Sequence, residues 1–181
     1  MAIDRQQLEQ LLEALPKRSL RSTLFNLAHA YARAADTSWN SLGTSKDADF
    51  AAPAIMCQSF AIELLLKFFL ALDHPLAETI DELKVAGVKL RCHKYSELFD
   101  QLTSTTKDRI ANVYATLSGK QTDATGFRHA LIAQGDDPFV YWRYVYENAT
   151  GFSHFDRQAF GLVTDALGKA AESERKAAPD A

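Results

Sequence analysis

Apolar residues recur at helical spacing along most of the chain. The pattern predicts a first helix from Ile3 to Leu15, closed by Pro16, and a second helix from about Ser19. The side chains expected on the buried face of the second helix are Leu20, Leu24, Leu27, Ala28 and Tyr31. Its arginines, on the other faces, are expected in solvent: Arg18, Arg21 and Arg33.

Residues Asp36 to Asp49 interrupt this pattern. Serine, threonine, asparagine, glycine and aspartate dominate them, and Trp39 and Leu42 are the only large apolar residues. The composition predicts a loop, and its length makes it the expected mobile cover over any site.

The segment from Pro53 to about Leu72 is apolar on nearly every side, which is typical of a buried central helix. Three polar residues in it, Ser59, Glu63 and Lys67, are spaced four apart and therefore share one face. Charged residues on such a helix are expected either to pair with an opposite charge or to have a function, because burying an unpaired charge is costly.

Further helices are predicted at 77–86, 93–102, 105–118, 125–132 and 156–172. Thr105 and Asp108 resemble a capping box, and Gly119 is expected to close the helix that they begin. Tyr141 to Glu147 fits either a helix or an extended segment, with no evident partner strand. The prediction is an all-α bundle of four to five main helices with short accessory helices, one domain over 1–172, and a disordered tail over 173–181.

Charge and cysteine content narrow the class of protein. The 181 residues include 20 Lys and Arg against 23 Asp and Glu, a formal net charge of -3, so we expect no duplex DNA partner. Cys57 and Cys92 form no CxxC motif, no secretory leader is apparent, and the apolar run over 64–72 is short for a membrane span. We therefore expect a cytoplasmic protein with reduced cysteines and no membrane partner.

Three segments carry a resemblance to a known family: Glu63-Leu-Leu-Leu-Lys67, His93-Lys-Tyr-Ser-Glu-Leu98 and Arg143-Tyr-Val-Tyr-Glu147. In their order and spacing they resemble small standalone bacterial members of the HEPN (higher eukaryotes and prokaryotes nucleotide-binding) superfamily. The resemblance covers about Phe60 to Glu147. It implies a bundle of four or five helices, often a homodimer, and for many members ribonuclease activity in toxin–antitoxin, phage-defence or RNA-processing systems.

The ribonuclease members carry an arginine followed, after four to six residues, by a histidine. None of the five histidines here, His29, His74, His93, His129 and His154, has an arginine at that spacing; seven residues separate Arg21 from His29. The resemblance therefore implies the scaffold and a nucleotide- or RNA-binding role without the ribonuclease motif.

The candidate chemistry lies in the same three segments. Glu63 and His93 are the candidate catalytic residues; the candidate ligand-binding residues are Lys67, Lys94, Arg143 and Glu147. A lysine or arginine there can bind a phosphate, and rings beside Arg143 suit stacking on a base. The structural alternative is an ion pair between Glu63 and Lys67 that holds the bundle together, with the aromatic residues as core or dimer contacts.

Three functions remain open on this evidence. The first is a noncatalytic HEPN-like homodimer that binds RNA, a nucleotide or a partner protein in bacterial stress or phage defence. The second is a divergent ribonuclease or nucleotide-modifying enzyme that uses Glu63, Lys67, His93 and Arg143. The third is a regulatory partner of a separate nucleotidyltransferase or toxin. We expect no cofactor and no metal, because no metal-ligand spacing or glycine-rich phosphate loop is present.

Overall fold

The computed structural model describes residues 19–143 and 155–177, and every regular element within these ranges is helical. The elements are α2 (Leu20–Ser45), η1 (Ala48–Phe50), α3 (Ala51–Asp73), α4 (Ile80–Val85), α5 (Tyr95–Asp100), α6 (Ser104–Ser118), α7 (Ala124–Ile132), α8 (Pro138–Arg143) and α9 (Arg157–Ala177). The all-α prediction is confirmed. The helix predicted from Ile3 to Leu15 lies outside the described residues.

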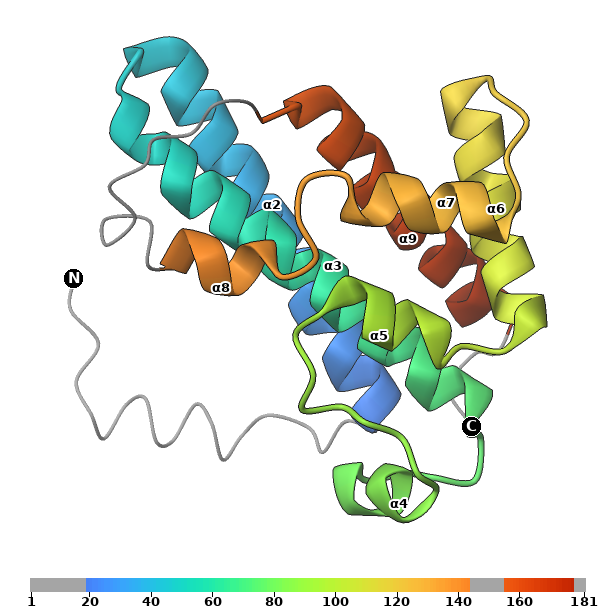
Figure 1. Ribbon diagram of the computed structural model, residues 1–181. Coiled ribbons are helices and arrows are strands. Elements are labelled where there is room, and N and C mark those ends of the chain that lie inside the picture. The colour runs from blue at the N-terminus through green and yellow to red at the C-terminus, as the bar shows by residue number, and fades with distance from the viewer. Residues whose placement is uncertain (1–18, 144–154, 178–181) are drawn as a thin grey trace, which may run out of the picture.

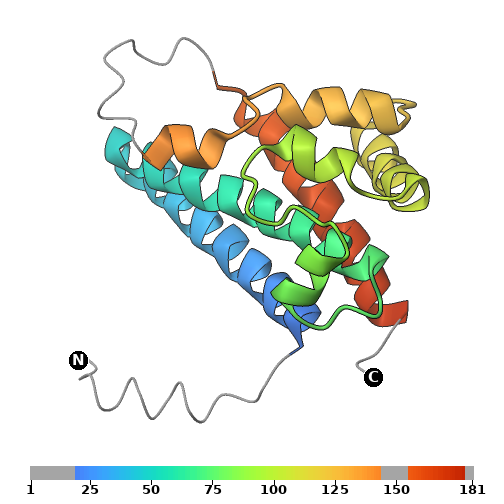
Figure 2. The same ribbon diagram turned by 60° about the horizontal axis from the view of Figure 1, so that its bottom comes forward.

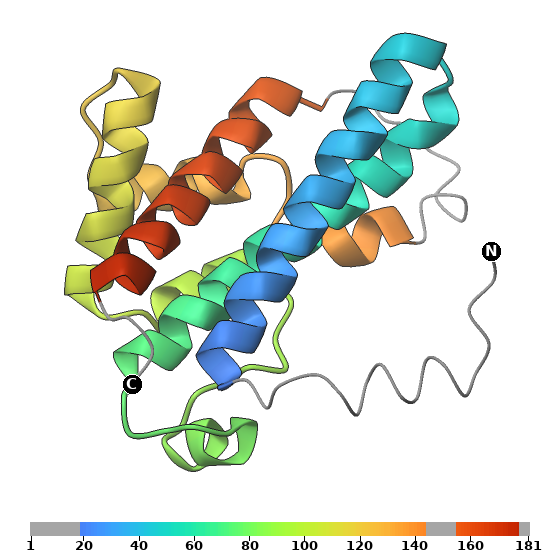
Figure 3. The ribbon, with the colours of Figure 1, turned by 180° about the vertical axis from the view of Figure 1, so that it is seen from behind.

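Helices α2 and α3 form a long antiparallel pair connected through η1, and α3 also packs against α5, α8 and α9 (Figure 1). Helices α5 and α8 lie along one side of α3, and α2 covers the opposite side (Figures 1 and 3). Helix α9 crosses α3 and packs against α6 and α7, which form the far edge of the bundle (Figure 2). The central position of α3 agrees with the prediction from its composition.

Burial explains the apolar composition of α3. Fourteen of its residues are buried, among them Ile62, Leu66, Phe69 and Leu70 with no exposed surface. By length and composition alone, Ala51–Asp73 is the one helix among the described residues that is long and apolar enough to cross a membrane, in contrast to the sequence prediction. Most of its apolar stretch is buried inside the bundle, an arrangement typical of a core helix.

The predicted loop over 36–49 is wrong for most of its length. Helix α2 continues to Ser45 and ends at Lys46, whose left-handed backbone conformation lets its N–H donate to the Leu42 carbonyl. Side-chain hydroxyls along this half donate to carbonyls four residues earlier, which satisfies groups that otherwise favour loops: Thr37, Ser38, Ser41, Thr44 and Ser45. Buried Ala35 and Trp39 hold this part of the helix against the bundle.

Two side-chain predictions for α2 need correction. Leu27 is 44% exposed, so it is not on the buried face. Arg21 is not free in solvent: its Nε donates to the Ala71 carbonyl at 3.2 Å and its Nη2 to the Pro75 carbonyl at 2.6 Å. A cation at the end of a helix satisfies terminal carbonyls and the helix dipole, so Arg21 caps the C-terminus of α3.

The caps place the other helix ends close to their predicted positions. Thr103, not the predicted Thr105, caps the start of α6, because the Thr103 hydroxyl accepts from the Thr106 N–H. The helix closes at Gly119, where φ is 67°. Asp123 caps α7, which therefore begins at Ala124, one residue before the predicted start at 125. Helix α9 runs to Ala177, so the prediction of disorder from residue 173 is wrong for 173–177.

A chain of buried hydrogen bonds connects α2, α3 and α9. Trp39 Nε1 donates to Gln58 Oε1 and Gln58 Nε2 donates to Thr164 Oγ1, both at 2.9 Å. The Thr164 hydroxyl donates in turn to the Phe160 carbonyl. Because buried polar groups need partners, this series of hydrogen bonds fixes the relative position of the three longest helices.

Candidate functional site

Glu63 is the centre of the candidate site. It lies in the middle of α3, its side chain is 1% exposed, and its carboxylate contacts two cationic or ionisable side chains. Lys67 Nζ, one turn later on α3, donates to Glu63 Oε1 at 2.6 Å. His93 Nδ1 lies 3.2 Å from Oε1 and 3.1 Å from Oε2. The structure therefore brings together three of the six predicted site residues.

The segment before α5 positions His93. Tyr95 is fully buried, and its hydroxyl donates to the Ser59 carbonyl on α3 at 2.7 Å. Asp136, from the connection between α7 and α8, accepts from the Ser96 N–H at 2.7 Å and from the Ser96 hydroxyl at 2.5 Å. Because burial raises the pKa of Tyr95 well above its ordinary value, its hydroxyl stays protonated as a donor. These bonds hold the segment against α3 and α8, so His93 has a defined place.

The geometry gives the two nitrogens of His93 different environments. Nδ1 points to the buried carboxylate, whereas the side chain as a whole remains 49% exposed. A carboxylate at Nδ1 favours the tautomer that carries a proton there, which leaves Nε2 as the acceptor nitrogen of the ring. The pair can accept a proton from a ligand or donate a hydrogen bond to an anion.

The neighbours of His93 are mostly cationic and exposed. Lys89, Arg91 and Lys94 have exposed side chains, and Lys94 Nζ lies 3.3 Å from Glu97 Oε1. Cys92 donates from Sγ to Glu97 Oε2 at 3.2 Å, and burial is the main cause that raises its pKa. A raised thiol pKa disfavours the thiolate, so Cys92 is not an activated nucleophile.

The last two predicted site residues are Arg143 and Glu147. Arg143 is the last residue of α8 and is exposed. Trp142 beside it is only 8% exposed and packs edge-on against Phe155, which agrees with the core contact that the sequence offered as the alternative to base stacking. Glu147 lies outside the described residues.

A row of three aromatic rings, one of which lies near His93, was not predicted as part of the site. The ring of Tyr31 on α2 packs edge-on against Phe60 on α3, with centroids 4.7 Å apart. Phe60 stacks on Phe139 of α8 at 4.7 Å, and the His93 ring lies 6.4 Å from Phe139. The three rings come from three different helices, so spacing in the sequence gives no sign that they meet.

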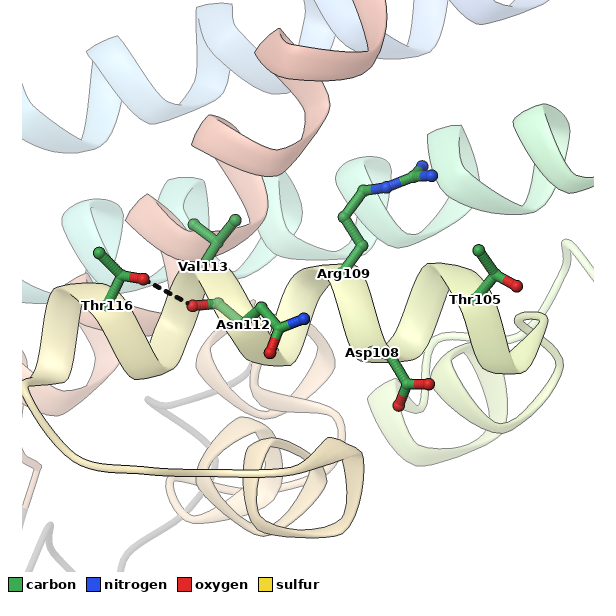
Figure 4. Close-up of a pocket in the computed structure, with 6 residues that line it drawn as sticks. All are labelled: Thr105, Asp108, Arg109, Asn112, Val113 and Thr116. Atoms are coloured by element: carbon green, nitrogen blue, oxygen red, sulfur yellow. Dashed lines mark hydrogen bonds between the residues drawn. The ribbon is translucent and has the colours of Figure 1, made fainter.

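A surface hollow of about 530 Å³ lies elsewhere, along α6. All its lining residues come from that one helix (Figure 4): Thr105, Asp108, Arg109, Asn112, Val113 and Thr116. Arg109 is paired with Glu174 of α9 at 2.5 Å. Most of the other lining residues are exposed polar side chains on the surface of the helix. The hollow has no buried ionisable group, so the cluster around Glu63 remains the better candidate.

Within residues 19–143 and 155–177, no three histidine, cysteine, aspartate or glutamate side chains gather at metal-binding distance. The described architecture defines an all-α bundle with a buried carboxylate–histidine pair at one side of its central helix. Comparison of the chain with models of protein families, with curated proteins and with solved structures finds no match.

Proposed function

We propose that the protein is a HEPN-like helical bundle that binds a phosphorylated nucleoside, free or within RNA, at Glu63, Lys67 and His93 without cleaving it. One observation carries the proposal: a half-exposed histidine is held by a fully buried carboxylate at the edge of a cationic segment, residues 89–94. A protonated imidazole and exposed lysine or arginine side chains form charge-assisted hydrogen bonds with phosphate oxygens. The proposal also includes the homodimer and the cytoplasmic location that the resemblance and the sequence suggest.

The buried carboxylate tunes the charge of this cluster. Glu63 compensates the charge of Lys67, so the net charge of the three groups is close to zero with a neutral His93 and positive with a protonated one. A phosphate beside His93 can accept a hydrogen bond from the imidazole ring. Phosphate binding at this place therefore gains from the same histidine that contacts Glu63.

Binding is tested by titrating the purified full chain with AMP and with a single-stranded oligoribonucleotide. Replacing His93 by Gln removes one charge-assisted hydrogen bond, which corresponds to roughly a tenfold or greater loss of affinity. His129→Gln is the matched control, because His129 is an exposed histidine on α7. Absence of binding to both ligands by the unmodified protein refutes the proposal and leaves a protein-interaction role, such as partner of a nucleotidyltransferase or toxin.

Catalysis is the second candidate, favoured by the Nδ1 contact with Glu63. A carboxylate that holds Nδ1 leaves Nε2 placed as a general base, an arrangement used in several hydrolytic sites. If the pair is a divergent ribonuclease centre, the oligoribonucleotide is cleaved, and both His93→Ala and Glu63→Gln abolish cleavage. Binding without cleavage supports the first function.

A further inference from the structure

We propose that Tyr31, Phe60 and Phe139, the aromatic row, form the base-binding part of the site, so that its ligand is recognised through a nucleobase as well as a phosphate. This inference rests on the proposed function, because it adds a second contact to the same ligand. It concerns residues that the sequence did not indicate.

The aromatic row remains partly exposed although the bundle has a large core. The core buries other rings almost completely, among them Phe69, Phe99 and Phe127, each 1% exposed or less. Tyr31, Phe60 and Phe139 are instead half-buried, and Phe60 contacts both of the other two rings. They place an apolar, partly open surface next to the charged cluster.

Helix geometry puts Phe60, the middle ring of the aromatic row, on the same side of α3 as Glu63 and Lys67, and Tyr31 contacts Phe60 from α2. Phe60 precedes Glu63 by three residues and Lys67 by seven, which are spacings of a single helix face. That side is covered by α8, which carries Phe139, and by the segment leading to α5, which carries His93 (Figure 1). Phe139 is therefore the ring of the aromatic row that lies near the charged cluster, with its centroid 6.4 Å from that of His93.

The chemistry of a nucleoside phosphate matches this arrangement. Bases stack on aromatic side chains with little dependence on sequence, and a phosphate seeks the cations. Since the Phe139 and His93 rings are 6.4 Å apart, one ribose is a sufficient link between a base at Phe139 and a phosphate at His93. The aromatic row is thus suited to an unpaired base, whose faces are open for stacking.

The test compares ligands that differ only in the base. AMP, ribose 5-phosphate and a single-stranded hexaadenylate are titrated into the full chain by calorimetry. We expect AMP to bind about tenfold or more tightly than ribose 5-phosphate, in line with the effect of one base–aromatic stack. Tighter binding of the hexamer than of AMP identifies RNA as the ligand, and equal binding per site identifies a free nucleotide.

Substitutions of Phe139 test whether this ring causes the preference for AMP over ribose 5-phosphate. Phe139→Leu keeps an apolar side chain and is expected to remove the preference for AMP while leaving the affinity for ribose 5-phosphate unchanged; Phe139→Tyr is expected to retain the preference. Tyr141→Leu, an exposed aromatic on the same helix, is the matched control and should behave as the unmodified protein.

The outcomes separate this inference from the proposed function. Equal affinities for AMP and ribose 5-phosphate overturn the role of the aromatic row while phosphate binding stands. A preference for AMP that survives Phe139→Leu also overturns it. Failure of all three ligands to bind overturns the proposed function, and the inference with it.

Discussion

Replacing Glu63 by Gln is the most direct test of how the candidate site and the fold depend on each other. The carboxylate is 1% exposed and has two contacts, Lys67 Nζ at 2.6 Å and His93 Nδ1 at 3.1 Å. Removing one partner of a buried pair costs about 3–5 kcal/mol, because the other charge stays buried without compensation. Lys67 is 13% exposed and Gln retains an acceptor oxygen. We therefore expect a smaller loss than this range, about 2 kcal/mol, which is typical of a lost charged hydrogen bond.

The measurement is the free energy of unfolding from urea titration, followed by circular dichroism, together with the thermal midpoint. For a chain of this size, about 2 kcal/mol lowers the midpoint by roughly 4–8 °C. Glu97→Gln is the matched control, since it removes an exposed carboxylate that lies close to the same segment. We expect it to leave the midpoint unchanged.

A double-mutant cycle with Lys67→Met isolates the pair itself. If the two side chains compensate each other, Glu63→Gln costs at least about 1 kcal/mol less in the Lys67→Met background than alone. Two results refute the reasoning: a cost for Glu63→Gln that matches the exposed control, or costs of the two substitutions that simply add.

Three further predictions concern pH and the support of the site. Burial is the main cause that lowers the pKa of His29, so the unfolded chain binds the proton more readily, and stability falls as pH drops below about 6.5; His29→Leu should flatten that slope in acid titrations of unfolding. The hydrogen bond from Arg128 is the main cause that lowers the pKa of Asp100. Arg128→Gln should therefore lower the free energy of unfolding by under about 1 kcal/mol at pH 7. This difference in stability from the unmodified protein should disappear as Asp100 becomes protonated, when the pH falls below about 4. Asp136→Ala removes the acceptor for Ser96 at the start of α5 and should cost about 0.5–2 kcal/mol by urea unfolding; no change would contradict its capping role.

The composition of α3 made the centre of the fold predictable. A segment that is apolar on every side has to be surrounded by other elements, and α3 is. The end of α6 was equally predictable, because only a residue that tolerates positive φ, such as Gly119, closes a helix in that way. Both features depend on local sequence alone.

The second half of α2 was not predictable from composition. Residues 36–45 have weak helix propensity, yet Trp39 anchors them through a buried hydrogen bond to Gln58, 19 residues away. Tertiary packing of this kind overrides propensity. The start of α6 was missed for a similar reason: Asp73 accepts from both Thr103 and Thr106, and that contact spans about 30 residues.

The candidate site was predictable in part. The contact between Glu63 and Lys67 follows from their spacing of four on one helix. The approach of His93 to the same carboxylate does not, because it depends on how Tyr95 attaches the segment to α3. For Trp142 the sequence left base stacking and core packing open, because nothing in its neighbours indicates which side of the short α8 faces inward.

The position of Glu63 explains how an ionised group is tolerated on the most apolar helix of the protein. Lys67, whose side chain is 13% exposed, donates to the carboxylate from within α3, and the half-exposed imidazole of His93 contacts both of its oxygens. The desolvation of the carboxylate is thus compensated from two directions, one within α3 and one from the segment before α5. A change of charge at His93, by protonation or by a bound anion, necessarily alters the environment of a group inside the core. The fold and the candidate site are therefore coupled through a single carboxylate.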